Sequence, residues 1–159
     1  MTTLLLWALA LLYIVLFVLA WRKVRGSKDA FEFIYLPAAL IGAFVWEDLL
    51  VFSAAFFIGT VLTLLVHDIR VGLLLLAAFW AVRSAGEALY FFLQQFHVPT
   101  HSPHAISHHF VLFRRLFGNV HDQKCFIFMQ ITWQVVLTAA IAALVLISLH
   151  WTTLPVWLS

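Results

Sequence analysis

Charged residues are scarce in this chain of 159 residues: Asp, Glu, Lys and Arg together make up 10% of it. A water-soluble domain needs many more charged side chains to cover its surface, so this composition excludes an ordinary soluble fold. The net charge of only +2 provides no strongly basic surface for nucleic acid. Cys125 is the single cysteine, which excludes a disulfide bond within the chain.

Hydrophobic residues, in contrast, account for 65% of the sequence and form long runs. A helix needs roughly 20 apolar residues to cross the hydrocarbon of a bilayer. The runs lack the alternation of barrel strands, and backbone polar groups in lipid must bond within the protein, so helices are predicted. We expect an all-α integral membrane helical bundle, a single transmembrane domain over residues 1–159. Its predicted spans are residues 3–21, 48–66, 71–96 and 125–149.

The stretch 31–66 is too long for one span and admits two arrangements. A hairpin of two short spans turning at residues 46–48 gives five spans, whereas a re-entrant or in-plane segment at residues 30–45 followed by one span gives four. Lysine and arginine concentrate in cytoplasmic loops. Four spans divide the loop cations 7 to 1 between the two faces, and five spans divide them 5 to 3. The charge rule therefore favours four spans, with the His-rich loop 97–124 cytoplasmic and both termini on the opposite face.

Arg83 and Glu87 lie near the middle of the third predicted span, one helical turn apart. Side chains at positions i and i+4 share a helix face and can pair. An isolated charge at the bilayer centre costs roughly 2.5 to 3.5 kcal/mol, so the two groups are expected to pair and to face protein instead of lipid. Ser84 and Gly86 are small, which is expected to let a neighbouring helix approach closely.

In the last predicted span Gln130, Gln134 and Thr138 recur every four residues and form a polar stripe. Gln134 is predicted to lie at the depth of Glu87 and to approach it. The predicted intramembrane polar centre therefore consists of Arg83, Glu87, Gln130 and Gln134. Two interpretations remain open: a neutral structural pin that fixes helix register, or the lining of a path for an ion, a proton or a small solute.

Six of the eight histidines fall between residues 97 and 121. Imidazole is the commonest metal-binding side chain, and an acidic pair before the second span is predicted to lie on the same cytoplasmic side. Together these residues predict a mixed histidine and carboxylate site for zinc or iron. The candidate ligands are His97, His101, His104, His108, His109, His121, Glu47 and Asp48.

The motifs HxxxH, from His97 to His101, and HxxxHH, from His104 to His109, resemble the histidine boxes of membrane fatty-acid desaturases and hydroxylases. Those families carry three boxes dispersed between several membrane hairpins, whereas both motifs here lie in one loop and no HxxHH is present. The resemblance covers a small part of the chain, so the activity of those families is not carried over. The alternatives to metal binding are a solvated loop resting near anionic headgroups and a pH-sensing loop.

Two functions follow from these patterns. The first is an oligomeric channel, transporter or membrane-complex subunit built around the polar centre, with lipids, further copies or other membrane subunits as partners. The second is a membrane metalloenzyme that uses the histidine cluster on a lipid-phase substrate. We favour the first because the polar residues inside the spans follow helical spacing, whereas the histidines do not.

Overall fold

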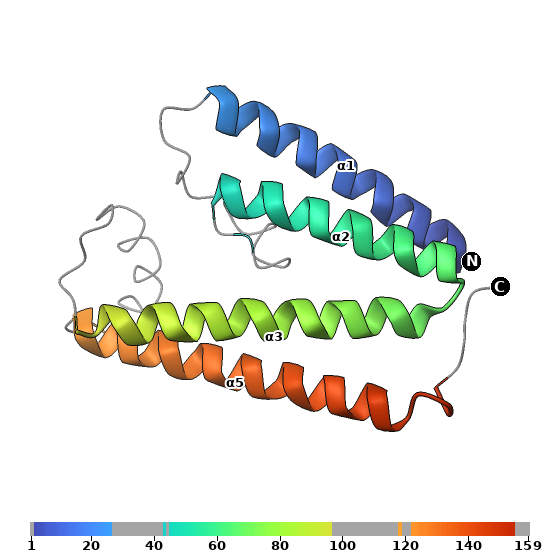
Figure 1. Ribbon diagram of the computed structural model, residues 1–159. Coiled ribbons are helices and arrows are strands. Elements are labelled where there is room, and N and C mark those ends of the chain that lie inside the picture. The colour runs from blue at the N-terminus through green and yellow to red at the C-terminus, as the bar shows by residue number, and fades with distance from the viewer. Residues whose placement is uncertain (1, 27–42, 44, 97–117, 119–121, 155–159) are drawn as a thin grey trace. The chain divides into compact units, whose positions relative to one another are not determined.

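A computed structural model describes residues 2–26, 43, 45–96, 118 and 122–154 of the chain. The helices in this part are α1 (Thr2–Gly26), α2 (Trp46–Val66), α3 (Ile69–Gln94) and α5 (Asp122–Leu149) (Figure 1). All four of these helices are long and apolar enough to cross a membrane. The prediction of an all-helical chain with four helices of spanning length is confirmed for the described residues, and each predicted span matches its helix to within five residues at either end.

The segment predicted to fold back at the membrane surface, residues 30–45, lies outside the described residues except for residues 43 and 45. The described chain divides into two compact units, and the division runs through α3 and α5. One unit comprises Met1–Ala77 and Leu144–Ser159, and the other comprises Ala78–Ala143.

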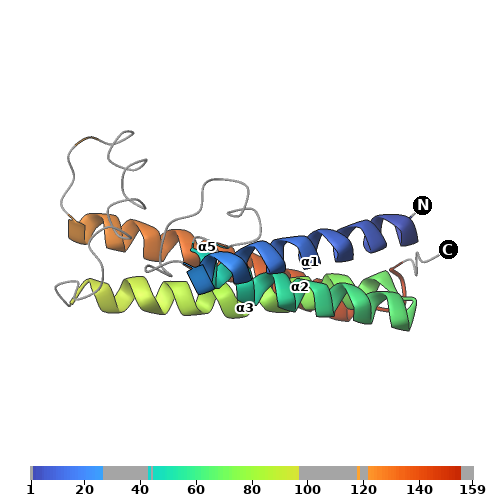
Figure 2. The ribbon, with the colours of Figure 1, turned by 90° about the horizontal axis from the view of Figure 1, so that it is seen from above.

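In the first unit α1 and α2 run antiparallel and pack against each other (Figures 1 and 2). Ala20, Ala43 and Leu49 are buried where the end of α1 meets the start of α2. Small side chains let two helix backbones approach closely, which is the main way helices associate in lipid. Farther along the pair, Tyr13 stacks on Phe56 with ring centroids 5.5 Å apart.

The ends of α2 follow from its local sequence. Val45 is extended (φ −131°, ψ 164°) and precedes the helix, and Glu47 and Asp48 lie in the first turn. Carboxylates are favoured there because the helix dipole is positive at its N-terminus. At the other end His67 adopts the left-handed conformation (φ 55°, ψ 33°), and its N–H donates to the carbonyl oxygen of Leu64 at 3.3 Å. This conformation ends the helix.

Only His67 and Asp68 connect α2 to α3. Oδ1 of Asp68 accepts a hydrogen bond from the backbone N–H of Arg70 at 2.9 Å, as the side chain of a helix N-cap does. Just beyond this turn Gly72 of α3 lies directly against the buried Thr63 of α2. A Cβ placed on Gly72 would come within 2.8 Å of Oγ1 of Thr63. The missing side chain at position 72 therefore allows the close packing of this hairpin.

In the second unit the end of α3 contacts the beginning of α5. The rings of Phe91 and Phe126 lie with their centroids 6.4 Å apart. Nε2 of Gln95, which follows α3, donates a hydrogen bond to Oε1 of Gln130 on α5. One aromatic contact and one amide contact thus join the two helices near the ends at which α3 stops and α5 starts.

The two small residues of α3 singled out from the sequence have different surroundings. Ser84 is fully buried, and its hydroxyl donates to the carbonyl oxygen of Trp80 one turn earlier. Gly86 is exposed, and a Cβ added there would meet no described atom of another element within 4 Å. The expectation that Gly86 admits a neighbouring helix therefore stays a prediction, since no described element lies against it.

Candidate functional site

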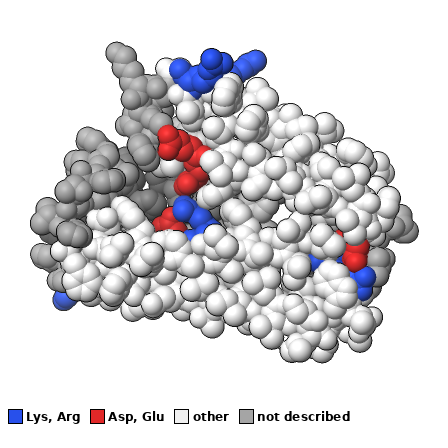
Figure 3. Space-filling view, in the orientation of Figure 1, with Lys and Arg blue, Asp and Glu red and all other residues white. Residues whose placement is uncertain are grey.

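Charged side chains occupy small areas among uncharged residues on the face shown in Figure 3. Within α3, Arg83 and Glu87 form an ion pair in which Nη1 and Oε1 lie 2.5 Å apart. The structure thus brings these two residues together, as their i, i+4 spacing predicts. The side chains are 18% and 15% exposed, so most of each charged group is enclosed. Mutual neutralisation at contact distance offsets part of the cost of removing both charges from water.

The two glutamines of the predicted centre lie in different surroundings. Gln130 is half-buried and accepts the hydrogen bond from Gln95. Gln134 is exposed on α5, and its side chain forms no hydrogen bond within the described part of the chain. No bond therefore joins Gln134 to Glu87 there. Trp133, the preceding residue, is buried, whereas Gln134, about 100° farther around the helix, is exposed.

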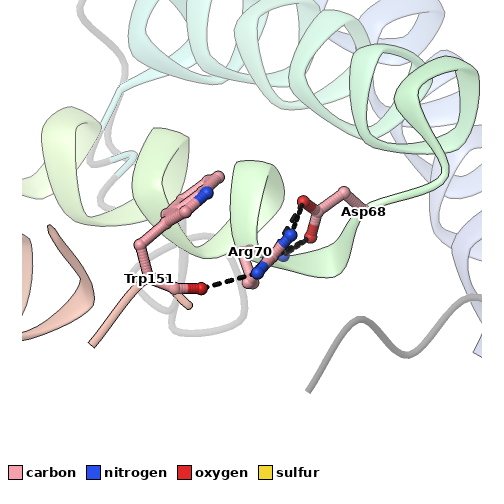
Figure 4. A network of polar contacts seen from close by, with 3 residues as sticks. All are labelled: Asp68, Arg70 and Trp151. Atoms are coloured by element: carbon pink, nitrogen blue, oxygen red, sulfur yellow. Dashed lines mark hydrogen bonds and ion pairs between the residues drawn. The ribbon is translucent and has the colours of Figure 1, made fainter. Parts of the chain in front are cut away.

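A polar network that was not predicted from the sequence surrounds Arg70 at the start of α3 (Figure 4). Its Nε lies 2.9 and 3.0 Å from the two carboxylate oxygens of Asp68, and its Nη2 lies 2.7 Å from Oδ2. Nη1 donates to the carbonyl oxygen of Trp151 at 2.5 Å. The guanidinium carbon also lies 4.8 Å from the centroid of the Trp151 ring, within cation–π range. Arg70 therefore ties the α2–α3 turn to the chain just after α5.

The electrostatics of this network affect Asp68. The side-chain hydrogen bonds from Arg70 are the main cause that lowers the pKa of the Asp68 carboxyl below its usual value, although desolvation opposes the shift. Asp68 is thus an anion at neutral pH.

The carbonyl oxygen of His150 accepts hydrogen bonds from the N–H groups of Thr153 and Leu154 at 3.0 and 2.9 Å. This turn ends α5 and leaves the carbonyl group of Trp151 available to Arg70.

Cations and indole rings meet at the other end of the α1–α2 pair. Nζ of Lys23 lies 5.5 Å from the ring centroid of Trp46, and Cζ of Arg25 lies 5.4 Å from that of Trp21. Basic residues and tryptophans at the end of an apolar helix are typical of the level of the lipid headgroups. This end of the pair carries the features expected of a membrane interface.

Most of the predicted metal ligands lie outside the described residues. The acidic pair is described: Glu47 is exposed and Asp48 is half-buried in the first turn of α2. Where the structure describes the chain, no three His, Cys, Asp or Glu side chains are grouped so that they could hold a metal ion. A metal site therefore stays a prediction for the residues that are not described, namely His97, His101, His104, His108, His109 and His121.

Comparison of the chain with protein-family models, with curated proteins and with solved structures finds no match.

Proposed function

We propose that the chain is a small polytopic membrane protein that acts as a subunit of an oligomer or of a larger membrane complex. The ion pair between Arg83 and Glu87 is the polar centre of each subunit. The observation that carries this proposal is the contact distance of the pair, 2.5 Å between Nη1 and Oε1, in the middle of a mostly apolar helix. Such a pair suits a register-fixing role better than conduction, because groups that conduct ions face water.

The small share of buried residues in the helices of one copy also supports a subunit role. Buried residues make up 11% of the most apolar 18-residue window of α1, of α3 and of the α5 segment, and 28% of that of α2. So few buried side chains leave most of each helix surface available for contact with lipid or with other helices. Helices in lipid associate through close packing and polar contacts, and a channel or transporter function would place its path among several copies.

Flux measurements on purified protein in liposomes test the role of the ion pair. We expect the wild type to move protons and potassium ions no faster than empty liposomes, and Glu87→Gln to leave this flux unchanged. Glu47→Gln is the matched control, because it makes the same chemical change at an exposed position. Flux through the wild type that falls in Glu87→Gln, with helicity intact, would assign the pair to a conduction path and overturn the register-fixing role.

Measurements of mass test the subunit role. Light scattering in mild detergent is expected to give a protein mass that is a multiple of 18.2 kDa, or a stable complex with another membrane protein. A protein that stays at 18.2 kDa, both alone and when extracted from its native membrane, would contradict the proposal.

Elemental analysis of the purified, untagged protein tests the metalloenzyme alternative. Zinc or iron at one atom or more per chain would support it, because ligand sets of histidine and carboxylate bind these ions. A preparation that is folded and metal-free would count against it. No contact among the described residues favours this alternative.

A further inference from the structure

The outward surface of α5 carries a polar side chain near the middle of its apolar stretch. Gln134 lies ten residues from Lys124 and fifteen from Leu149, the two ends of that stretch. At roughly 1.5 Å per residue these distances are about 15 and 22 Å. The exposed amide has donors and an acceptor but forms no hydrogen bond within the described residues. In hydrocarbon, an amide in this position is costly unless another polar group contacts it.

The hydroxyl groups of the two exposed threonines nearest to Gln134 in α5 do not share this need. Oγ1 of Thr132 donates to the carbonyl oxygen of Phe128, and Oγ1 of Thr138 donates to that of Gln134, both at 2.9 Å. Threonine in a helix can thus satisfy its hydroxyl within its own backbone. In the middle of α5, the exposed amide of Gln134 therefore requires a partner from outside the described chain, whereas the hydroxyls of Thr132 and Thr138 do not.

Among the exposed residues of α5, those in line with Gln134 follow the spacing of a helix–helix seam. Ile127, Ile131, Gln134, Thr138 and Ile141 succeed one another in alternate steps of four and three residues, and all are exposed. This repeat of 3.5 residues keeps a narrow stripe facing a partner helix in left-handed packing. The stripe is uncharged, and most of its side chains are β-branched, so they lose little rotamer freedom when they pack.

We propose that this stripe, residues 127, 131, 134, 138 and 141, docks a second copy of the same chain, α5 against α5. The two Gln134 amides then hydrogen-bond to each other across a two-fold axis. This inference rests on the proposed function, in which the chain assembles in a membrane. A second copy fits because an amide is self-complementary, and a two-fold axis along the membrane normal places equal residues at equal depth. One polar seam residue also fixes the register and the number of partners.

Cysteine cross-linking in phosphatidylcholine vesicles tests the position of the contact. In a Cys125→Ala background with wild-type helicity, Ile141→Cys places a thiol on the stripe. Ala139→Cys is the matched control, because it is also exposed but lies about 160° away around the helix. Mild oxidation is expected to give at least fivefold more disulfide-linked dimer with Ile141→Cys. Equal yields from the two positions would overturn the proposed contact.

Energy transfer between copies labelled with fluorescent proteins at the N-terminus tests the amide without changing Cys125. Gln134→Leu is expected to weaken association in vesicles about three- to tenfold, the range for one interhelical hydrogen bond. Thr132→Val, which removes a hydroxyl already bonded within α5, is expected to match the wild type. Both variants change exposed positions, and their helicity is checked by circular dichroism.

The outcomes separate this inference from the proposed function. If the wild type associates but Gln134→Leu associates equally well, the inference is overturned and the subunit role stands. If Ile141→Cys cross-links a different protein in native membranes, that protein occupies the stripe, and the inference is likewise overturned. If the wild type stays monomeric in vesicles at every protein-to-lipid ratio and extracts from native membranes alone, both fail.

Discussion

At the scale of single residues, Arg83 and Glu87 depend on each other. Changing Glu87 to Gln keeps the shape of the side chain but removes the negative charge 2.5 Å from the guanidinium. We expect the variant to unfold more easily by about 1–3 kcal/mol, because the guanidinium of Arg83 then loses the carboxylate charge at contact distance from it. The effect is smaller than for a completely buried pair, since both side chains keep some exposure. Unfolding by dodecyl sulfate in mixed micelles, followed by circular dichroism, measures it.

The double variant Arg83→Leu with Glu87→Leu is the companion experiment. Replacing both members of an ion pair with apolar residues is often neutral, so we expect it to recover most of the stability lost in Glu87→Gln. Glu47→Gln, at an exposed position, is expected to change stability by less than about 0.5 kcal/mol. If the double variant is destabilised as strongly as Glu87→Gln, the two side chains do more than neutralise each other's charge.

Asp68 provides a prediction about pH at the same scale. Arg70 lowers the pKa of the Asp68 carboxyl in the folded protein, whereas an aspartate carboxyl titrates at about 3.9 in an unfolded chain. A carboxyl with a lowered folded pKa contributes stability that is fully present above the unfolded pKa and is lost as pH falls through the folded pKa. Asp68→Asn should therefore have a lower thermal midpoint than the wild type at pH 7, and this gap should begin to narrow below about pH 4 and close once the pH lies below the folded pKa.

The comparison between Asp68→Asn and the wild type isolates the charge, because asparagine is also a good N-cap and can keep the bond to the Arg70 N–H. Thermal unfolding of both proteins at intervals from pH 7 down to pH 2 gives the curve. A gap that stays constant over the whole range would show that the ion pair with Arg70 contributes nothing, and that the variant acts through packing.

At the scale of elements, the α2–α3 hairpin depends on the missing side chain at Gly72. A Cβ there would lie 2.8 Å from Oγ1 and 3.1 Å from Cγ2 of Thr63, whose hydroxyl is bonded to the carbonyl oxygen of Gly59. Overpacking costs about 1–3 kcal/mol, and the better helix propensity of alanine returns up to about 1 kcal/mol. Gly72→Ala is therefore expected to destabilise the protein, by about 1–2 kcal/mol in micelle unfolding.

Gly86→Ala is the matched control for Gly72→Ala, because it makes the same change in the same helix at a position with open space around it. It should be neutral or stabilising by up to about 1 kcal/mol. Thr63→Ala combined with Gly72→Ala should restore stability relative to Gly72→Ala alone, because it removes the atoms that clash. Equal effects of the two alanine variants would refute the close contact between the helices.

The sequence predicts where a helix lies along the chain better than it predicts how that helix is rotated about its own axis. The positions of the helices along the chain follow from the apolar runs, because the hydrocarbon thickness sets the length of a span. The pairing of Arg83 with Glu87 follows from spacing within one helix. The orientation of Gln134 does not follow from its depth, because rotation about the helix axis depends on packing with other elements. In α5, Trp133 is buried and Gln134 faces outward.

The network around Arg70 shows a second limit of the sequence. The short segment HDIR between two apolar runs contains an N-cap signal, Asp68, two residues before a cation, and this signal could have predicted their pairing. Nothing in the spacing indicates that Arg70 also reaches Trp151, which lies 81 positions later. Such a contact depends on where the end of α5 lies in three dimensions.

At the scale of the whole molecule, the proposed membrane topology follows from the distribution of cations. The end of α1 carries Arg22, Lys23 and Arg25, and α5 begins beside Lys124, whereas the connection between α2 and α3 is followed by Arg70 alone. Arg70 is also neutralised by Asp68, so the effective imbalance is larger than a count of cations indicates. Positively charged ends stay preferentially in the cytoplasm. This distribution predicts that the end of α1 and the start of α5 share the cytoplasmic face.

Labelling with a membrane-impermeant thiol reagent distinguishes four spans from five. In a Cys125→Ala background, Gly26→Cys, Lys124→Cys and Thr152→Cys place single thiols at exposed positions after α1, at the start of α5 and after α5. With four spans, positions 26 and 124 should react only after lysis, whereas position 152 should react in intact cells that carry the protein in the plasma membrane. With five spans, positions 26 and 152 would behave alike and position 124 would differ. That second pattern would refute the predicted topology, because it would place the start of α5 on the face opposite the basic end of α1.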